Sequence, residues 1–206
     1  MRTFLVSGRC IAAPPPADWR EQLAQMLGAR PRRIGTWAEL GLFGALHCMA
    51  DAGEKTLPPD AQIWLGSLRG TYAATGVVLE QLREDLPMPL AFLQTQPSQL
   101  LAMLAAQMAW KGHACFVAGS EPHALMRLAG AQAGAGGLLL GWLDEAAGGE
   151  TCWLRLQPCD AVTGGIAAPA TAALFSAQTS HIHLTRTGLE VNQAAHARLG
   201  ASGAGW

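Results

Sequence analysis

Short apolar runs alternate with longer mixed segments over the first 158 positions of the chain. The runs at 61–68, 115–117 and 138–143 hold few polar side chains, which is typical of strands buried on both faces of a sheet. Parallel neighbours need long crossovers, so the intervening segments are expected to be helices. The pattern predicts strands at 3–13, 61–68, 115–117, 138–143, 151–156 and 181–186, and helices at 19–27, 37–49, 70–84, 100–110, 189–199 and from 122 onward.

Two turns mark helix starts in the middle of the chain. Pro97-Ser98 precedes an apolar stretch that ends at Trp110, and its residues leave almost no polar face, so this helix is expected to be buried nearly all round. Gly119-Ser120-Glu121-Pro122 is a tight strand-to-helix turn, in which Ser120 can cap the helix and Glu121 favours its positive end. These signals predict a βαβ unit.

The last quarter of the chain carries weaker signals. Residues 151–156 alternate between apolar and polar positions, as expected for a strand covered on one face. Residues 159–206 are rich in glycine and alanine, with a short strand and a short helix expected among them. We therefore divide the chain into a domain at 1–158 and a C-terminal extension at 159–206. The expected fold class is α/β, with a mixed sheet between helices on both faces.

Composition narrows the possible functions. Half of the 206 residues are hydrophobic and only 14% are charged, which suggests that a partner covers part of the surface. The formal net charge of −1 gives no reason to expect nucleic-acid binding. No apolar stretch reaches about 18 residues, so no membrane span is expected. The apolar run after Arg2 is too short for a signal peptide, and the cytoplasm is the simplest expected location.

Residues that could carry chemistry are few and scattered. The five cysteines are widely spaced and form no C-x-x-C pair, so neither a zinc site nor a disulfide framework is expected. Cys115 lies inside an apolar run, where a cysteine is usually a small core residue. His181 and His183 share one face of an expected strand, but no carboxylate or cysteine at ligand spacing accompanies them. We therefore expect no metal.

The middle of the chain combines a Pro-x-Pro-Leu-x-Phe sequence ending at Phe92 with an apolar helix that ends in Lys111-Gly112. A strand, a sharp turn into a helix and an apolar strand ending in Gly-x-x-Asp144 follow. This order resembles the central block of the β-ketoacyl synthases. The chain is most similar to the short ketosynthase-like proteins of aryl polyene clusters, which are similar to chain-length factors. The resemblance covers about residues 1–158.

This resemblance implies one half of a thiolase fold, a three-layer arrangement, whereas a complete synthase has a second, similar half. In a condensing synthase a cysteine nucleophile sits in the strand-to-helix turn, where the helix dipole lowers its pKa. The corresponding residues here, 118–121, contain no cysteine. The synthases' His-Gly-Thr-Gly-Thr-type loop is also absent, since Thr179-Ser180-His181-Ile182-His183 has a different residue order. The implied protein is a non-catalytic subunit without a cofactor.

The implied partner is a full-length β-ketoacyl-ACP synthase, in a heterodimer that serves fatty-acid-like or polyketide-like biosynthesis. The subunit would shape the cavity for the growing acyl or polyene chain, and acyl carrier protein would be reached through the complex. Arg30, Arg32 and Arg33 could dock that acidic carrier, although a solvated loop is the plainer interpretation. The residues expected at the interface or cavity are Phe92, Thr95, Gln99, Met103, Cys115 and Phe116.

Two other hypotheses remain open. The chain could be an acyl-transferring or condensing enzyme that uses Cys115, which would need an exposed thiol near a cation. It could also be a structural stabiliser that only keeps its partner soluble.

Overall fold

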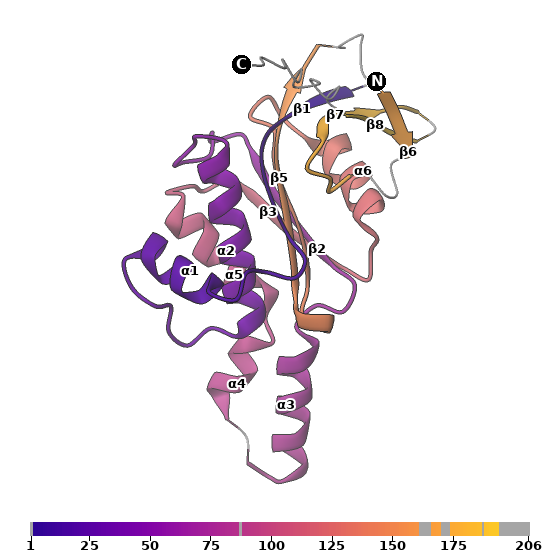
Figure 1. The fold of residues 1–206 in the computed structure, drawn as a ribbon. Coiled ribbons are helices and arrows are strands. Elements are labelled where there is room, and N and C mark those ends of the chain that lie inside the picture. Colours follow the sequence, from indigo (N-terminus) through magenta and orange to yellow (C-terminus); the bar gives the residue numbers. More distant parts are fainter. Residues whose placement is uncertain (1, 87, 161–165, 170–173, 187, 194–206) are drawn as a thin grey trace, which may run out of the picture.

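The chain folds around one mixed sheet in the computed structural model, which describes residues 2–86, 88–160, 166–169, 174–186 and 188–193. The sheet has eight strands in the order β3-β2-β4-β5-β1-β7-β8-β6 (Figure 1). The strands are β1 (Arg2–Ala12), β2 (Gln62–Ser67), β3 (His113–Ala118), β4 (Leu138–Asp144), β5 (Glu150–Cys159), β6 (Ile166–Pro169), β7 (Thr179–Leu184) and β8 (Leu189–Gln193). The helices are α1 (Trp19–Leu27), α2 (Thr36–Asp51), α3 (Tyr72–Arg83), α4 (Pro89–Gln94), α5 (Pro97–Gln107), α6 (Pro122–Gln132) and the 3-10 turn η1 (Ala146–Gly148).

The parallel part of the sheet is centred on β2. This strand runs parallel to β3 and β4, with Leu65 opposite Phe116 on one side and Gly141 on the other. The crossover from β2 to β3 carries α3, α4 and α5, and the crossover from β3 to β4 carries α6. Because β5 is antiparallel to both β4 and β1, strands β1 to β4 share one direction. This arrangement confirms the expected mixed α/β sheet.

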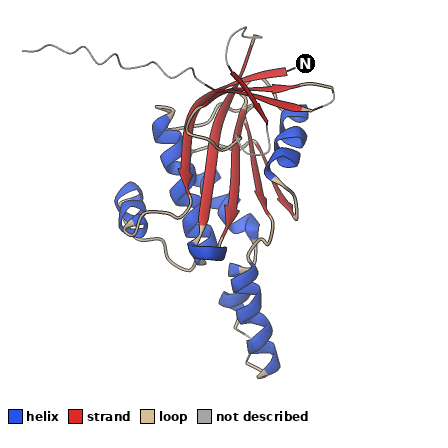
Figure 2. Ribbon diagram, turned by 45° about the vertical axis from the view of Figure 1, so that its right-hand side comes forward, coloured by secondary structure: helices blue, strands red, loops and turns tan. Residues whose placement is uncertain are grey.

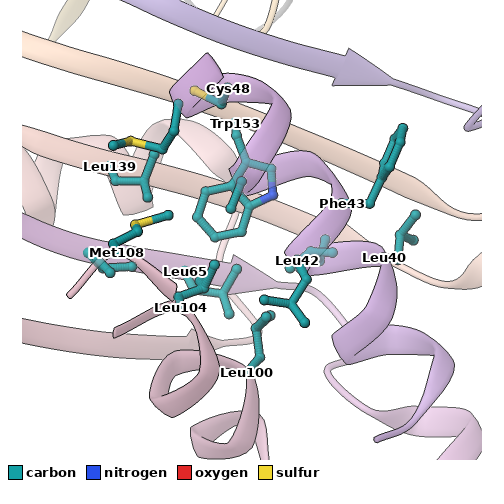
Figure 3. Close-up of a cluster of buried hydrophobic side chains, with 14 of the residues drawn as sticks. Leu40, Leu42, Phe43, Cys48, Leu65, Leu100, Leu104, Met108, Leu139 and Trp153 are labelled. Carbon is teal, nitrogen blue, oxygen red and sulfur yellow. The ribbon is translucent and has the colours of Figure 1, made fainter. Parts of the chain in front are cut away.

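Helices α1, α2 and α5 cover one face of the sheet (Figure 1). The central helix α2 approaches β5 closely, since a Cβ atom on Gly44 would lie 2.2 Å from Thr151 Oγ1 and 2.5 Å from Trp153 Cδ1. Figure 3 shows the Trp153 ring among apolar side chains of this face, including Leu42 and Leu104. The small residue on α2 therefore makes room for a tryptophan of the core.

The opposite face is covered by α6 and by the strands that follow β5. Leu125 and Met126 of α6 are fully buried, in a cluster with Phe4, Leu140 and Ile182. Figure 2 shows helices on both sides of the sheet, which confirms the three-layer fold. No described helix has the length and apolar content needed to cross a bilayer.

The described residues after 158 continue the sheet. β7 pairs with β1, placing Thr3 opposite His183, and β8 pairs with β7. The strand expected at 181–186 is present as β7, but the helix expected at 189–199 is wrong for Leu189–Gln193, which forms β8. Val191 is fully buried, so the apolar spacing there serves one face of a strand. Residues 194–206 lie outside the described part of the chain.

Candidate functional site

Strand β3 forms one edge of the sheet. Within the described residues it pairs only with β2, so the backbone groups on its other side have no sheet partner. None of its six residues is buried, and the four central ones are half-buried. The expectation of a central strand at 115–117 is therefore wrong. An apolar run gives the same sequence pattern whether it is covered by the chain's own elements or by another protein.

The side chains of β3 point alternately to the two layers. Phe116 packs against the α2 and α5 face and meets the Trp37 ring edge-on, with 5.8 Å between ring centroids. Cys115 is half-buried and packs toward the α6 face. Among the described residues, the one hydrogen-bond partner of Cys115 Sγ is the Phe116 carbonyl oxygen, at a long 3.8 Å. This environment indicates that Cys115 contributes to packing, because no neighbouring group in the described part of the chain is seen to activate its thiol.

In each of the other four cysteines, including Cys159, burial raises the pKa of the thiol. Burial raises the pKa of Cys10 to about 11. Burial also raises the pKa of Cys48 and Cys152 well above the usual thiol range. These three side chains therefore stay protonated near neutral pH and are inert as nucleophiles.

The remaining predicted contact residues lie on α4 and α5, which lead into β3. Phe92 is 56% exposed on α4, and Thr95 directly follows that helix, its Oγ1 donating to the Phe92 carbonyl oxygen at 2.8 Å. Gln99 and Met103 lie one turn apart on α5 and are half-buried. The Gln99 Oε1 is buried without a hydrogen-bond partner among the described residues. Contrary to expectation, α5 also has an exposed side.

The turn between β3 and α6 has the strand-to-helix geometry that the sequence predicts. Gly119 adopts a φ of 68°, and its N–H donates to the Ser67 carbonyl oxygen at 2.9 Å. The residue that caps α6 is Glu121, not Ser120, and it makes no side-chain cap bond. The Ser120 Oγ is buried without a described partner. No thiol or imidazole belongs to residues 118–121, so the turn has no cysteine nucleophile.

The basic loop and the histidine pair stand apart from β3. Arg30, Arg32 and Arg33 are exposed, and none of them forms an ion pair with a described residue. His183 is buried, with Nδ1 3.0 Å from Thr3 Oγ1 and Nε2 2.9 Å from Asn192 Nδ2. Both nitrogens of this ring are already engaged. Over the described ranges, no cluster of three metal-ligating side chains exists.

Sequence reasoning missed the hairpin made by α3 and α4. The helix expected at 70–84 has an apolar stripe of Tyr72, Val77, Val78 and Leu82, but no residue of α3 or α4 is buried. Figures 1 and 2 show the hairpin projecting past the ends of the strands, below the sheet. The missed signal is the sequence from Glu80 to Met88, which combines acidic residues with exposed leucines and so fits neither a core nor a solvated surface.

Searches of family models and of curated proteins find no match to this chain. Among solved structures, the complex AntDE:AntF, described as a type II PKS acyl-carrier protein with its ketosynthase bound to the hexaketide, matches with a TM-score of 0.56 and 12% identity. That match covers 76% of this chain and 63% of the other. The ishigamide ketosynthase/chain length factor matches with a TM-score of 0.50 and 13% identity, over 69% of this chain and 47% of the other.

A third structure is the ketosynthase ApeO in complex with its chain length factor ApeC from Xenorhabdus doucetiae. It matches with a TM-score of 0.50 and 15% identity, over 75% of this chain and 79% of the other. The chain thus spans less than two thirds of the first two matched chains and most of the third. At these identities the likeness concerns the fold: this chain has the thiolase-like fold of ketosynthases and chain length factors.

Proposed function

We propose that this chain is a chain-length-factor-like subunit without catalytic activity of its own, which pairs with a full-length β-ketoacyl-ACP synthase. In the heterodimer it bounds the cavity in which an acyl or polyene chain grows, in fatty-acid-like or polyketide-like biosynthesis of the aryl polyene type. Residues 1–158 would form the ketosynthase-like unit, and residues 159–206 a C-terminal extension. The fold likeness supports this role.

The observation that carries the proposal is the open edge of β3. Edge strands are commonly protected by charged residues, proline or bulges, because they otherwise pair with other chains. The β3 sequence, His-Ala-Cys-Phe-Val-Ala, contains no proline, lysine or carboxylate, and its pairing with β2 is regular. Addition of a partner strand would satisfy the free backbone groups and cover Cys115, Phe116 and Val117.

The neighbouring helices extend the same surface. Phe92 and Met103 offer apolar contact, while Thr95 and Gln99 offer hydrogen-bonding groups. Gln99 is the most informative of these, because a buried carbonyl without a donor costs about 1–3 kcal/mol and a partner could supply that donor. We propose that these four residues, together with Cys115 and Phe116, line the interface or the adjoining cavity.

Carrier protein would reach the pair on the side of the basic loop. Three exposed guanidinium groups within four positions, none in an ion pair with a described residue, would attract an acidic surface and raise its association rate. We therefore propose Arg30, Arg32 and Arg33 as a docking surface for acyl carrier protein.

Co-expression tests the pairing. Each β-ketoacyl synthase of the source organism is expressed with this chain, and the products are analysed by size-exclusion chromatography with multi-angle light scattering. We expect a one-to-one heterodimer with one of them, burying more than about 2,000 Å² in total, as obligate interfaces do. A monomer that pairs with no synthase would refute the proposal, and a homodimer would show that the partner is wrong.

Two substitutions locate the interface. Phe116→Glu should abolish pairing, because an unpaired buried charge costs several kcal/mol. Since Phe116 also packs on Trp37, the exposed Phe92→Glu provides a variant that leaves the core intact. Leu128→Glu on α6, where Leu128 is 48% exposed, is the matched control and should pair normally.

A further inference from the structure

The α3–α4 hairpin, residues 72–94, concentrates the exposed apolar surface of the molecule. Fourteen large hydrophobic side chains are exposed among the described residues, and nine of them belong to this hairpin. Exposed apolar groups gathered in this way mark a contact surface, whereas single ones do not. The nine are Tyr72, Val77, Leu79, Leu82, Leu86, Met88, Leu90, Phe92 and Leu93.

Hydrogen bonds hold the base of the hairpin, its root, to the rest of the protein. Thr71, which is buried, donates from Oγ1 to the Thr95 carbonyl oxygen at 2.8 Å, and so ties the start of α3 to the end of α4. The Ala73 N–H donates to Glu145 Oε1 at 2.6 Å, and the Gly70 N–H donates to Ser67 Oγ at 2.8 Å. The hairpin is therefore held in one direction before any partner binds, which lowers the entropic cost of binding.

A hollow of about 320 Å³ opens between the two helices of the hairpin. Its lining is apolar except for Gln81, whose Oε1 is buried and has no hydrogen-bond partner among the described residues. A group that enters the hollow thus meets an apolar wall with one unpaired hydrogen-bond acceptor, the Gln81 Oε1. An aromatic side chain that carries an N–H or O–H donor, tryptophan or tyrosine, has this chemistry.

The tip of the hairpin is acidic. Glu80, Glu84 and Asp85 provide three carboxylates against the single guanidinium of Arg83, which leaves a formal charge of −2. Arg83 pairs with Glu80, and neither Glu84 nor Asp85 forms an ion pair with a described residue. An anionic membrane surface would repel such a tip, whereas lysine or arginine on a protein would attract it.

The root of the hairpin lies close to β3. A Cβ atom built on Gly70, directly before α3, would lie 3.6 Å from Phe116 Cζ on β3. A subunit that pairs with β3 would therefore lie beside the root of the hairpin.

We propose that the α3–α4 hairpin inserts into an apolar groove of the partner synthase. A tryptophan or tyrosine of the groove enters the hollow and donates to Gln81, and basic residues at the end of the groove pair with Glu84 and Asp85. This inference rests on the proposed function and adds the chemistry of the partner's surface. In this proposal the hairpin, together with β3, determines how the two subunits are positioned relative to each other.

Photocrosslinking tests the insertion. The crosslinking residue p-benzoylphenylalanine is placed at Leu82 in the hairpin or at Leu128 on α6, two positions of similar exposure, and the chain is co-expressed with the synthase. We expect a covalent product from the Leu82 position and none from the Leu128 position. The converse result, or no product from either position in a complex that forms, would overturn the inference and leave the proposed function standing.

Two variants test the chemistry. Gln81→Leu should leave the free chain at least as stable as before, because it removes a buried unpaired oxygen, but raise the dissociation constant about tenfold, because the partner's donor loses its acceptor. Glu84→Lys with Asp85→Lys should weaken pairing at least tenfold, whereas Glu21→Lys on α1 should not. Unchanged affinity in both hairpin variants would overturn the inference. Failure of all synthases to bind would overturn the proposed function too, and a homodimer abolished by the lysine variant would identify a second copy as the occupant.

Discussion

Among single residues, the environment of Cys115 distinguishes most clearly between a binding subunit and an enzyme. Catalytic thiols lie at helix N-termini or beside cations, where the thiolate is stabilised. Cys115 lies in the middle of β3, and the one hydrogen-bond partner of its thiol among the described residues is the Phe116 carbonyl oxygen. Its half-exposed position was not predictable, because the apolar neighbours that indicate a strand do not indicate whether that strand is central or at the edge.

We predict that Cys115→Ser leaves the pathway product unchanged in a strain that expresses the partner synthase. The expected cost is a loss of about 1 kcal/mol in the free energy of unfolding, since a half-buried thiol is replaced by a more polar group. Product analysis by liquid chromatography and urea unfolding measure the two quantities. Loss of all product from a folded, partner-bound variant would favour the condensing enzyme instead.

The histidine pair on β7 predicts a pH dependence of stability. Burial, and to a smaller extent the neighbouring His183, lowers the pKa of His181 below its ordinary value of 6.5. Burial lowers the pKa of His47 in the same way. The unfolded chain therefore binds more protons than the folded chain as the pH falls through 6.5, and the stability that is present above this pH is lost.

Unfolding by urea at pH 5, 6, 7 and 8 measures this dependence. We expect the midpoint to fall below about pH 6.5 and the fall to be shallower in His181→Gln. Equal pH dependence in the two proteins would show that His181 does not contribute.

At the scale of elements, the sequence predicted most of the architecture of residues 1–158. Apolar runs and turn residues placed β2, β4 and α6 within a few residues of their observed bounds. The order of strands, which puts β3 at the edge, depends on tertiary pairing that local patterns do not encode. Likewise Leu189–Gln193 is a strand because β7 offers it a partner, although the same residues permit a short helix.

Glycines in α2 and α3 give opposite predictions for one substitution. Gly44→Ala should destabilise the protein by about 1–3 kcal/mol, because its Cβ would meet Thr151 and Trp153 within 2.5 Å. Gly76→Ala should stabilise it by up to about 1 kcal/mol, because nothing lies within 4 Å and alanine is the better helix former. Thermal unfolding of both variants measures the contrast. A destabilising Gly76→Ala would mean that α3 is packed in the free protein.

At the scale of the whole molecule, apolar surface is distributed unevenly. Both faces of the sheet are covered by the chain's own elements, with α1, α2 and α5 on one face and α6 on the other. The excess of hydrophobic residues is therefore found on the hairpin and along β3. Composition predicted that some surface is covered by a partner but could not locate it, because the α3 stripe has the spacing of an ordinary core helix.

This distribution predicts that the isolated chain self-associates through the hairpin. We expect Leu79→Gln with Leu82→Gln to raise the solubility of the free protein severalfold. The free energy of unfolding should change by no more than about 0.5 kcal/mol, because neither side chain is buried. The same pair of substitutions should abolish binding to the synthase. Light scattering of the isolated chain and thermal unfolding measure the first two effects, with Leu128→Gln as the control on α6. If the melting temperature fell by several degrees, the two leucines would belong to the core of the free protein, and the hairpin would not be a surface kept for a partner.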